Sequence, residues 1–325
     1  MKKIFISGKI PKIAYEVLSK KYDVTMHDDL RPLTKEEIIE GIKGKDALLC
    51  ILSDKIDREI IESNPKLKII ANYGAGFDNI DIQTASEHNI YVTNTPLVST
   101  VSTAELTLGL MLGISRRIAE GDRIMREGSF AGWAPLYQLG TELSRKTLGI
   151  IGIGNIGKAV AKRAKAFDMD IIYYNRTPLS KEVEREYGVR YASLDELIST
   201  SDYITLHVSY NTALHHIIDE KALNKMKSSA YLINAARGPL VDEAALLNAL
   251  KNKIIAGAAL DVFEFEPNIT KGLESLDNVL LTPHIGNATH EARGEMAQIA
   301  AYNIIDALKG DNPRNAVNQK LIEVA

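Results

Sequence analysis

Three ionisable side chains, Arg237, Glu266 and His284, stand in otherwise apolar stretches of this 325-residue chain. The stretches are INAARGPLVD, DVFEFEP and LTPHIGNATH, and each follows an apolar run typical of a strand. Singly, each residue is explained as an ordinary loop or surface residue. As a set they offer a charged fork for a carboxylate, an imidazole suited to proton transfer near neutral pH, and a carboxylate to orient that imidazole. The set therefore indicates acid–base chemistry on an anionic substrate.

A glycine-rich turn, GIGNIG, precedes these residues and follows the strand pattern TLGII. Gly152 permits a tight turn, Gly154 lets the backbone approach a pyrophosphate, and Gly157 lets the next helix pack on the strand. The helix pattern KAVAKRAKAF follows, so free N–H groups and the positive end of the helix dipole would face the phosphates. This order predicts dinucleotide binding, although a glycine-rich turn without a ligand has the same motif.

The next strand pattern, DIIYY, ends in Asn175, Arg176 and Thr177 instead of the acidic residue that usually accepts the ribose hydroxyls of NAD. A carboxylate there would repel the 2′-phosphate of NADP. Asn175 removes that repulsion, Arg176 can pair with the phosphate, and Thr177 can add a hydroxyl. We therefore expect NADP(H) to be favoured over NAD(H). The alternative is that Arg176 is a solvated surface charge and that NAD binds without the acid.

The elements that must position these residues form two series of alternating strand and helix patterns. The first fills about a hundred residues, and the second begins at KTLGIIGIGNIG. Such alternation predicts an α/β fold with parallel sheets covered by helices on both faces. Between the series, one long helix is expected from Ser99 to Arg126, with a first half so apolar that it should be buried.

Length and composition limit the class of protein. A chain of this length favours two domains. A formal net charge of −3 gives no reason to expect a nucleic-acid or anionic-membrane partner. The single cysteine, Cys50, lies in the apolar run DALLCIL and is expected to be a core residue in a reducing compartment. The N-terminal stretch has no secretory pattern and no apolar run is long enough to span a membrane, so a cytoplasmic protein is expected.

Together with NYGAGFDNID in the first series, these stretches resemble the D-isomer-specific 2-hydroxyacid dehydrogenase family over nearly the whole chain. The GWAP stretch at Trp133 and the Asn-Arg-Thr strand ending are most similar to its glyoxylate/hydroxypyruvate reductases. The resemblance implies two doubly wound domains with the active site in the cleft that they form. Residues 1–98 and 287–325 would form a smaller, flavodoxin-like substrate-binding domain, and residues 99–286 a Rossmann domain.

The same resemblance implies reduction of a small 2-keto acid by hydride transfer from the cofactor. His284 would be the general acid in reduction and the base in oxidation, and Glu266 would orient the imidazole and favour its protonated form. Arg237 would clamp the substrate carboxylate and polarise the carbonyl. Backbone N–H groups around Ala75 and Gly76 would complete the anion site.

Other contacts are implied less directly by the resemblance. Asp261 would help to hold the nicotinamide amide, with a structural cap as the alternative, and Thr103 would approach the nicotinamide unless it only starts a helix. A homodimer would form through the cofactor domain and its long helix, with Trp133 reaching the partner. The remaining cofactor contacts expected from the family pattern are Asn155, Ile156 and Ala235.

No metal site is predicted, because His215 and His216 are adjacent and would not share one helical face. Ser209 stands where family members often have proline, a departure that concerns the local loop. Two other functions stay open: a dinucleotide-sensing, corepressor-like protein on the same fold, and a dehydrogenase for a larger or phosphorylated 2-hydroxy acid. A methyltransferase interpretation of the glycine loop lacks support from the arginine, glutamate and histidine.

Overall fold

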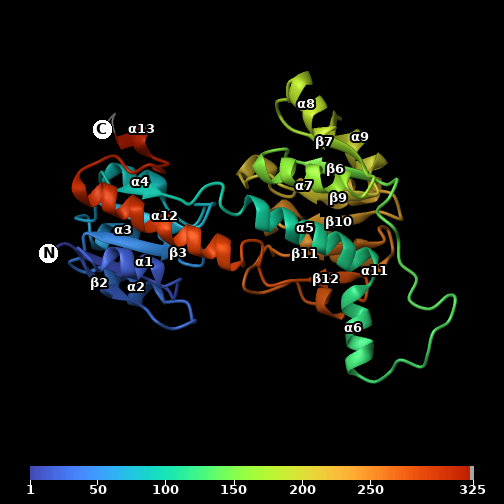
Figure 1. The fold of residues 1–325 in the computed structure, drawn as a ribbon, viewed down its shortest axis with the longest axis horizontal. Coiled ribbons are helices and arrows are strands. Elements are labelled where there is room, and N and C mark those ends of the chain that lie inside the picture. Colours follow the sequence, from blue (N-terminus) through green and yellow to red (C-terminus); the bar gives the residue numbers. More distant parts are fainter. Residues whose placement is uncertain (323–325) are drawn as a thin grey trace. The chain divides into compact units, whose positions relative to one another are not determined.

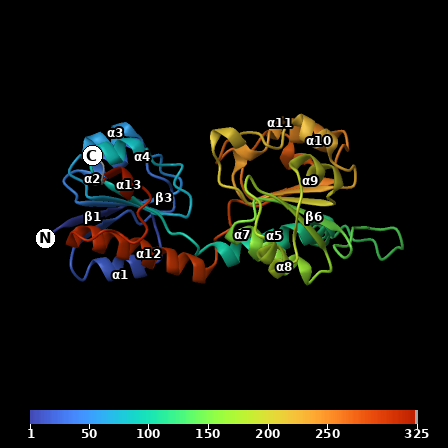
Figure 2. The same cartoon turned by 90° about the horizontal axis from the view of Figure 1, so that it is seen from above.

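The computed structural model describes residues 1–322, and the chain folds as two compact units (Figure 1). Unit 1 is Met1–Ser99 together with the segment that starts at Asn287, and unit 2 is Thr100–Gly286. Each unit is a parallel sheet with helices on both faces (Figure 2). The predicted α/β class with two doubly wound units is therefore confirmed.

Unit 1 is built on five parallel strands in the part of the chain that the structure describes. The strands are β1 (Lys3–Ile6), β2 (Asp23–Met26), β3 (Ala47–Ile51), β4 (Ile69–Tyr73) and β5 (Tyr91–Thr93). The helices are α1 (Ile13–Leu18), α2 (Lys35–Ile42), α3 (Arg58–Ser63), α4 (Ile82–Glu87), α12 (His290–Lys309) and α13 (Gln319–Ile322). The strand order β2-β1-β3-β4-β5 is that of flavodoxin-like sheets.

The alternation of side chains along each strand explains why both faces of this sheet are covered. Ile4 and Ile6 of β1 are buried with residues of α1 and α12, whereas Phe5 is buried with residues of α2, α3 and α4 on the other face. The tail of the chain therefore completes the core of unit 1. Cys50 is fully buried, and burial raises the pKa of its thiol.

Unit 2 contains seven parallel strands among the described residues. They are β6 (Thr147–Ile151), β7 (Asp170–Tyr174), β8 (Arg190–Tyr191), β9 (Tyr203–Leu206), β10 (Tyr231–Asn234), β11 (Gly257–Leu260) and β12 (Val279–Leu281). The α-helices are α5 (Thr100–Ser115), α6 (Ile118–Arg126), α7 (Asn155–Lys165), α8 (Lys181–Tyr187), α9 (Leu194–Thr200), α10 (Glu220–Lys225) and α11 (Glu243–Lys251). Short 3₁₀ turns are η1 (Thr212–Leu214), η2 (Gly238–Leu240) and η3 (Leu273–Ser275).

The order of these strands is β12-β11-β10-β9-β6-β7-β8, which contains the Rossmann arrangement. The connections reverse direction at β6, which lies between β7 and β9. Ligands of such sheets bind at the carboxyl ends of the strands beside this switch point. One face packs on α5 and α7 and the other on α9, α10 and α11 (Figure 2).

The long helix predicted from Ser99 to Arg126 is wrong, because it is two helices. Helix α5 ends at Ser115, where the carbonyl accepts a hydrogen bond from the N–H of Thr141 at 2.8 Å. Arg117 then adopts a left-handed backbone with φ of 52°, and α6 begins in a new direction. Thr141, which bonds the end of α5, lies more than twenty residues further along the chain. The sequence around Ser115 therefore gives no signal that the helix ends there.

The first half of the prediction is confirmed, since most of α5 is buried. No residue of α6 is buried, and the irregular stretch after it is equally exposed. Trp133 and Leu136 are each 84% exposed. The other large apolar side chains exposed in this arm, which we define as residues 118–139, are Ile118, Met125, Phe130, Tyr137 and Leu139. None of the described helices is both long and apolar enough to cross a membrane.

Candidate active site

The glycine loop joins β6 to α7 with the backbone that the motif requires. Gly152 has φ of 97°, and a Cβ on Gly157 would lie 2.2 Å from the carbonyl oxygen of Gly152. The N-cap residue of α7 is Gly154, which has no side chain to bond the first N–H groups, and Asn155 and Ile156 form the first turn. The start of α7 is thus an uncapped helix terminus, a suitable binding site for phosphate.

The loop after β7 also supports the glycine turn. The side chain of Asn175 accepts a hydrogen bond from the N–H of Ile153 at 3.0 Å, a contact that the sequence did not reveal. Arg176 and Thr177 are exposed. Within residues 1–322, neither side chain has a hydrogen-bond or ion-pair partner, so the guanidinium of Arg176 can receive an anion.

Arg237, Glu266 and His284 follow three adjacent strands of the unit 2 sheet. Arg237 lies between β10 and η2, Glu266 follows β11, and His284 follows β12. Because the strands are parallel, their carboxyl ends lie at the same edge of the sheet. The strand order therefore brings together residues that are up to 47 positions apart in the sequence (237 to 284).

The histidine and the glutamate form a hydrogen-bonded pair. Nδ1 of His284 lies 3.0 Å from Oε2 of Glu266, and Oε1 of Glu266 accepts a hydrogen bond from the N–H of Phe263 at 2.9 Å. Because the glutamate occupies Nδ1, Nε2 of the imidazole remains for another partner. Each side chain is about one-third exposed, at 34% and 37%, so the pair is accessible to a ligand.

The carboxyl group of Glu266 is held in its ionised form. Burial alone would raise its pKa, but the hydrogen bond and the charge of His284, the N–H of Phe263 and the charge of Arg237 together lower it. The guanidinium of Arg237 is therefore close enough to act on Glu266, and it also donates a 2.7 Å hydrogen bond to the carbonyl of Ala236. An ionised carboxylate, an imidazole and a guanidinium thus act on one another at this edge of the sheet.

Asp261 has a structural role that explains the position of His284. Its buried carboxylate accepts hydrogen bonds at 2.8 Å from the N–H groups of both Ile285 and Gly286, and one at 2.6 Å from the hydroxyl of Thr282. Its carbonyl accepts the N–H of His284, which has a left-handed φ of 52°. These contacts keep the His284 turn in place.

Two other residues that are expected to contact the cofactor lie near the His284 turn or at the carboxyl end of β10. The hydroxyl of Thr103, in the first turn of α5, donates to the carbonyl of Gly286 at 3.1 Å. Ala235 directly follows β10 and precedes Arg237 by two residues. Thr103 therefore ties α5 to the turn that carries His284, in addition to any contact with a ligand.

A buried glutamate that the sequence analysis missed holds the turn that carries Glu266. Glu243, at the first position of α11, is 1% exposed. Its two carboxylate oxygens accept the N–H of Glu264 at 2.6 Å and that of Thr270 at 3.2 Å, so it holds both ends of the segment around Glu266. The only signal of Glu243 in the sequence was an acidic residue in the otherwise apolar pattern EAALLNAL. The sequence did not show which groups it bonds.

The loop after β4 in unit 1 has two backbone N–H groups without an acceptor among residues 1–322. The side chains of Asn94 and Asn72 donate to the carbonyls of Ala75 and Gly76, both at 2.7 Å. The N–H groups of Ala75 and Gly76 make no hydrogen bond to any described residue. The carbonyls are thus fixed and the amide N–H groups stay available to an anion.

The family model for the D-isomer specific 2-hydroxyacid dehydrogenase NAD binding domain matches residues 108–286. A Staphylococcus haemolyticus protein assigned as a 2-hydroxyacid dehydrogenase is 54% identical over 319 residues, covering 98% of this chain and 100% of that protein.

Two solved structures carry more specific names. A glyoxylate reductase from Paecilomyes thermophila is 34% identical with a TM-score of 0.87, covering 98% of this chain and 99% of that one. An NADPH-dependent glyoxylate/hydroxypyruvate reductase from Sinorhizobium meliloti, in complex with NADP and malonate, is 30% identical with a TM-score of 0.87. That comparison covers 97% of this chain and 96% of the other.

Proposed function

Because the chain belongs to the D-isomer-specific 2-hydroxyacid dehydrogenase family, we propose that it is an oxidoreductase that reduces a small 2-keto acid such as glyoxylate or hydroxypyruvate. The observation that carries the proposal is the pairing of His284 with Glu266 beside the charge of Arg237. The product is the corresponding 2-hydroxy acid. The names of the two reductases described above support the choice of a small substrate.

The residues around the glycine loop fit a dinucleotide. The tight approach of Gly157 to Gly152 leaves no room for a side chain, and the uncapped start of α7 supplies N–H donors for a pyrophosphate. We assign Gly152, Gly154, Asn155, Ile156 and Gly157 to this contact. When bound, the nicotinamide supplies the hydride. The further cofactor contacts in this proposal are Thr103, Ala235 and Asp261.

We assign the proton-transfer role to His284. Its Nδ1 is held by Glu266, so Nε2 is the atom that donates a proton to the substrate carbonyl oxygen in reduction and accepts it in oxidation. The ionised Glu266 fixes the ring and stabilises the imidazolium that proton donation requires. Arg237 pairs with the substrate carboxylate, because a planar guanidinium can form two parallel hydrogen bonds to it.

The proposal gives unit 1 the role of substrate binding and unit 2 that of cofactor binding. The N–H groups of Ala75 and Gly76 bind the substrate carboxylate, since their carbonyls are held by Asn72 and Asn94 while the amides have no described acceptor. This role uses backbone donors, but Asn94 holds the carbonyl of Ala75 in place. Substitution of Asn94 should therefore raise KM more than it lowers kcat.

For the cofactor we propose a preference for NADP(H) over NAD(H). Arg176 is exposed and has no partner among residues 1–322, so pairing with a 2′-phosphate would cost it no existing contact. Asn175 is engaged with the glycine loop and brings no negative charge to the site. The Sinorhizobium meliloti reductase, whose structure holds NADP, supports this choice.

We also propose that the chain forms a homodimer. The arm of residues 118–139 exposes seven large apolar side chains, including Trp133 and Leu136 at 84% each. Large apolar side chains exposed together in one segment are typical of a protein interface. A second copy of the chain that covers this arm would remove these side chains from water, with Trp133 and Leu136 as its best-exposed contacts.

The experiment that tests the function is steady-state kinetics with glyoxylate, hydroxypyruvate, pyruvate and larger or phosphorylated 2-keto acids, each with NADPH and NADH. The proposal expects the highest kcat/KM for glyoxylate or hydroxypyruvate with NADPH. A higher value for a larger or phosphorylated acid would correct the substrate. Cofactor binding without turnover on any substrate would favour the dinucleotide-sensing alternative and contradict the proposal.

Cofactor choice is tested with Arg176→Ala. We expect the ratio of kcat/KM for NADPH over NADH to fall by about tenfold, because a charge-assisted contact to the 2′-phosphate is lost. Arg190→Ala is the matched control, since Arg190 is an exposed arginine of the same unit that pairs with Glu196. An unchanged ratio in Arg176→Ala, or a preference of the wild type for NADH, would contradict this assignment.

The dimer is tested by sedimentation analysis of Leu136→Glu. A charge in the apolar arm should weaken self-association by at least about tenfold, because an unpaired charge would be buried at the interface. Leu30→Glu is the control, since Leu30 is 85% exposed but lies in unit 1 outside the arm. A monomeric wild type, or equal association of the two variants, would exclude this interface.

A further inference from the structure

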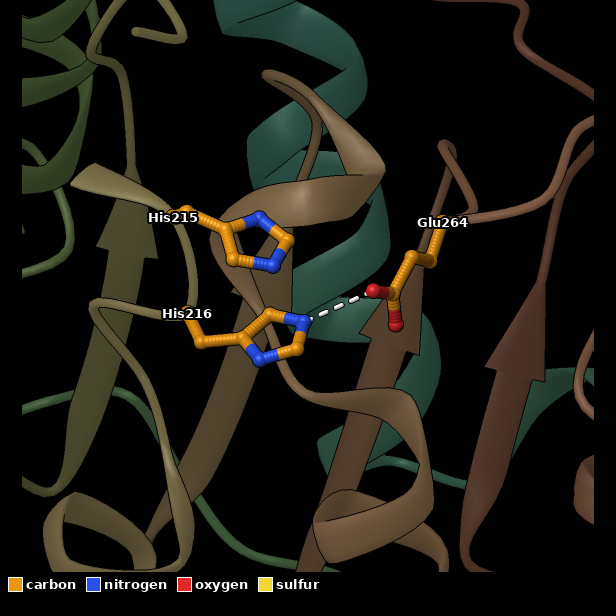
Figure 3. Close-up of side chains that lie close together, drawn as sticks. All are labelled: His215, His216 and Glu264. Atoms are coloured by element: carbon orange, nitrogen blue, oxygen red, sulfur yellow. Dashed lines mark hydrogen bonds and ion pairs between the residues drawn. The ribbon is translucent and has the colours of Figure 1, made fainter. Parts of the chain in front are cut away.

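Three possible metal ligands gather in unit 2, outside the residues assigned to catalysis: His215, His216 and Glu264 (Figure 3). One ligand atom from each lies within 4.8 Å of the others. We propose that these three side chains form a binding site for a divalent transition-metal ion, with Zn²⁺ as the best match to two imidazoles and one carboxylate. This site goes beyond the proposed reductase function and does not depend on it.

The backbone explains how two adjacent histidines point the same way. Both follow the short turn η1, and His216 has a left-handed φ of 52°, which rotates its ring toward that of His215. The centroids of the two rings lie 3.8 Å apart, and the ring planes are nearly parallel, at 23° to each other. The prediction against a metal site assumed helical spacing, whereas the structure has no helix at this point. Both imidazoles thus present nitrogen atoms toward the turn that follows β11.

The carboxylate of Glu264 completes the set from that turn. Its Oε1 lies 2.7 Å from Nε2 of His216, at hydrogen-bond distance (Figure 3). Two ligands of one tetrahedral Zn²⁺, each ~2.1 Å from the ion, lie about 3.4 Å apart. An ion would therefore replace the shared proton, which passes to solvent, and separate the two groups by less than an ångström. The ring of His215 is exposed, and it must turn out of its stack on His216 for its lone pair to converge on the same point.

The opposite nitrogens of both rings already face partners that could orient them. Nδ1 of His216 lies 3.9 Å from the carboxylate of Asp242, and Nδ1 of His215 lies 3.4 Å from the hydroxyl of Tyr210. Metal-binding histidines typically use one nitrogen for the ion and the other for an orienting carboxylate or hydroxyl. The arrangement therefore leaves Nε2 of each ring for the ion.

The burial of the three ligands differs in a way that suits a bound ion. The side chain of Glu264 is 12% exposed and that of His216 is 29% exposed, so two ligands are held in place by the fold. The N–H of Glu264 is bonded to the buried Glu243, which fixes the backbone of this ligand. His215 lies on the solvent side, where a water molecule has access to a fourth coordination position.

The test is direct metal binding by the metal-free full-length protein. Titration with Zn²⁺ against a chromophoric chelator, and with Co²⁺ by visible absorption, measures affinity, stoichiometry and coordination without using enzyme activity. We expect one Zn²⁺ per chain, an intense absorption band typical of four-coordinate Co²⁺, and a higher melting temperature with Zn²⁺. Failure of the wild type to bind stoichiometrically at micromolar Zn²⁺ would overturn the proposal.

Variants identify the ligands. His215→Ala and Glu264→Gln should each weaken Zn²⁺ binding by at least about tenfold, and Asp242→Asn by about tenfold through the orientation of His216. Because His215 is exposed, its removal should leave the fold intact. His88→Ala is the control, since His88 is a single histidine 3.9 Å from Glu62 without a second imidazole. Equal affinity of His215→Ala and His88→Ala would place the ion elsewhere and refute this site.

Discussion

Two histidine–glutamate pairs in unit 2 use the same groups in opposite ways. Glu264 and Glu266 are two positions apart, and both partner histidines, His216 and His284, have φ of 52°. His284 meets its carboxylate through Nδ1 at 3.0 Å, whereas His216 does so through Nε2 at 2.7 Å. In the first pair Nε2 has no partner in the described part of the chain, but in the second the other nitrogen, Nδ1 of His216, faces Asp242.

On the roles proposed above, a histidine–carboxylate pair by itself does not identify a catalytic centre. The His284 pair lies near the charge of Arg237 and has an imidazole nitrogen available for a substrate. The His216 pair has carboxylates on both sides and a second imidazole stacked on it, which suits a cation and not an anionic substrate. The charges around each pair, and the nitrogen left open, separate the two roles.

The largest effect is expected from His284→Ala. Loss of the proton donor should lower kcat by about 10³-fold, while the Kd for NADPH, measured by fluorescence, stays within about twofold. His216→Ala, assayed without metal ions, should lower kcat by less than about fivefold, because the proposal gives its pair no proton-transfer role. Near-normal turnover of His284→Ala, or equal losses in the two variants, would break the distinction between the pairs.

A smaller loss is expected from Glu266→Gln. The amide keeps the shape but removes the charge, so kcat should fall by roughly 10- to 100-fold. Steady-state kinetics of both proteins at one pH measure this loss. A kcat equal to that of the wild type would mean that the charge of Glu266 is not needed.

The smallest expected effect is on folding stability and concerns His207. Its ring nitrogens are buried without a partner among residues 1–322. Burial lowers its pKa from 6.5 to about 3. As pH falls below 6.5, the unfolded chain binds a proton at this position and the folded chain does not, so stability is lost progressively toward pH 3. The slope is at most about 1.4 kcal/mol per pH unit.

His207→Leu removes this contribution. Between pH 7 and pH 5, the wild type should lose about 1–2 kcal/mol more unfolding free energy than the variant, as measured by urea denaturation. All other histidines are common to the two proteins, so the difference isolates His207. Equal losses would show that a hydrogen-bond partner satisfies the ring in solution, as the carboxylates do for His284 and His216.

Much of the fold was accessible from local patterns. Apolar runs separated by helical patterns predicted both parallel sheets, and the glycine motif in its strand–loop–helix context predicted the start of α7. The sequence motifs also placed the chain in its family, which the comparisons confirm. The break between α5 and α6 escaped prediction, because the Ser115 carbonyl is bonded by Thr141, which folds back from a distant segment.

The residues that hold the turns of the site in place could not be predicted either, for a related reason. Asp261 and Glu243 look like ordinary acids in the sequence, and only the fold shows that their oxygens bond the backbone of the turns around His284 and Glu266. Likewise, Asn175 reads as the absence of an acid, whereas in the structure it holds the glycine turn. These partners are 21 to 25 residues apart, yet each pair joins different elements of unit 2.

By itself, the sequence determined the two parallel-sheet units, the dinucleotide turn and the chemical types of the candidate catalytic groups. These follow from periodicity, from backbone limits at glycine and from the intrinsic chemistry of side chains. Only the tertiary structure decided which nitrogen of each histidine is engaged and which carboxylate engages it. That choice depends on strand order and on left-handed turns at His216 and His284, which direct side chains from separate elements toward one another.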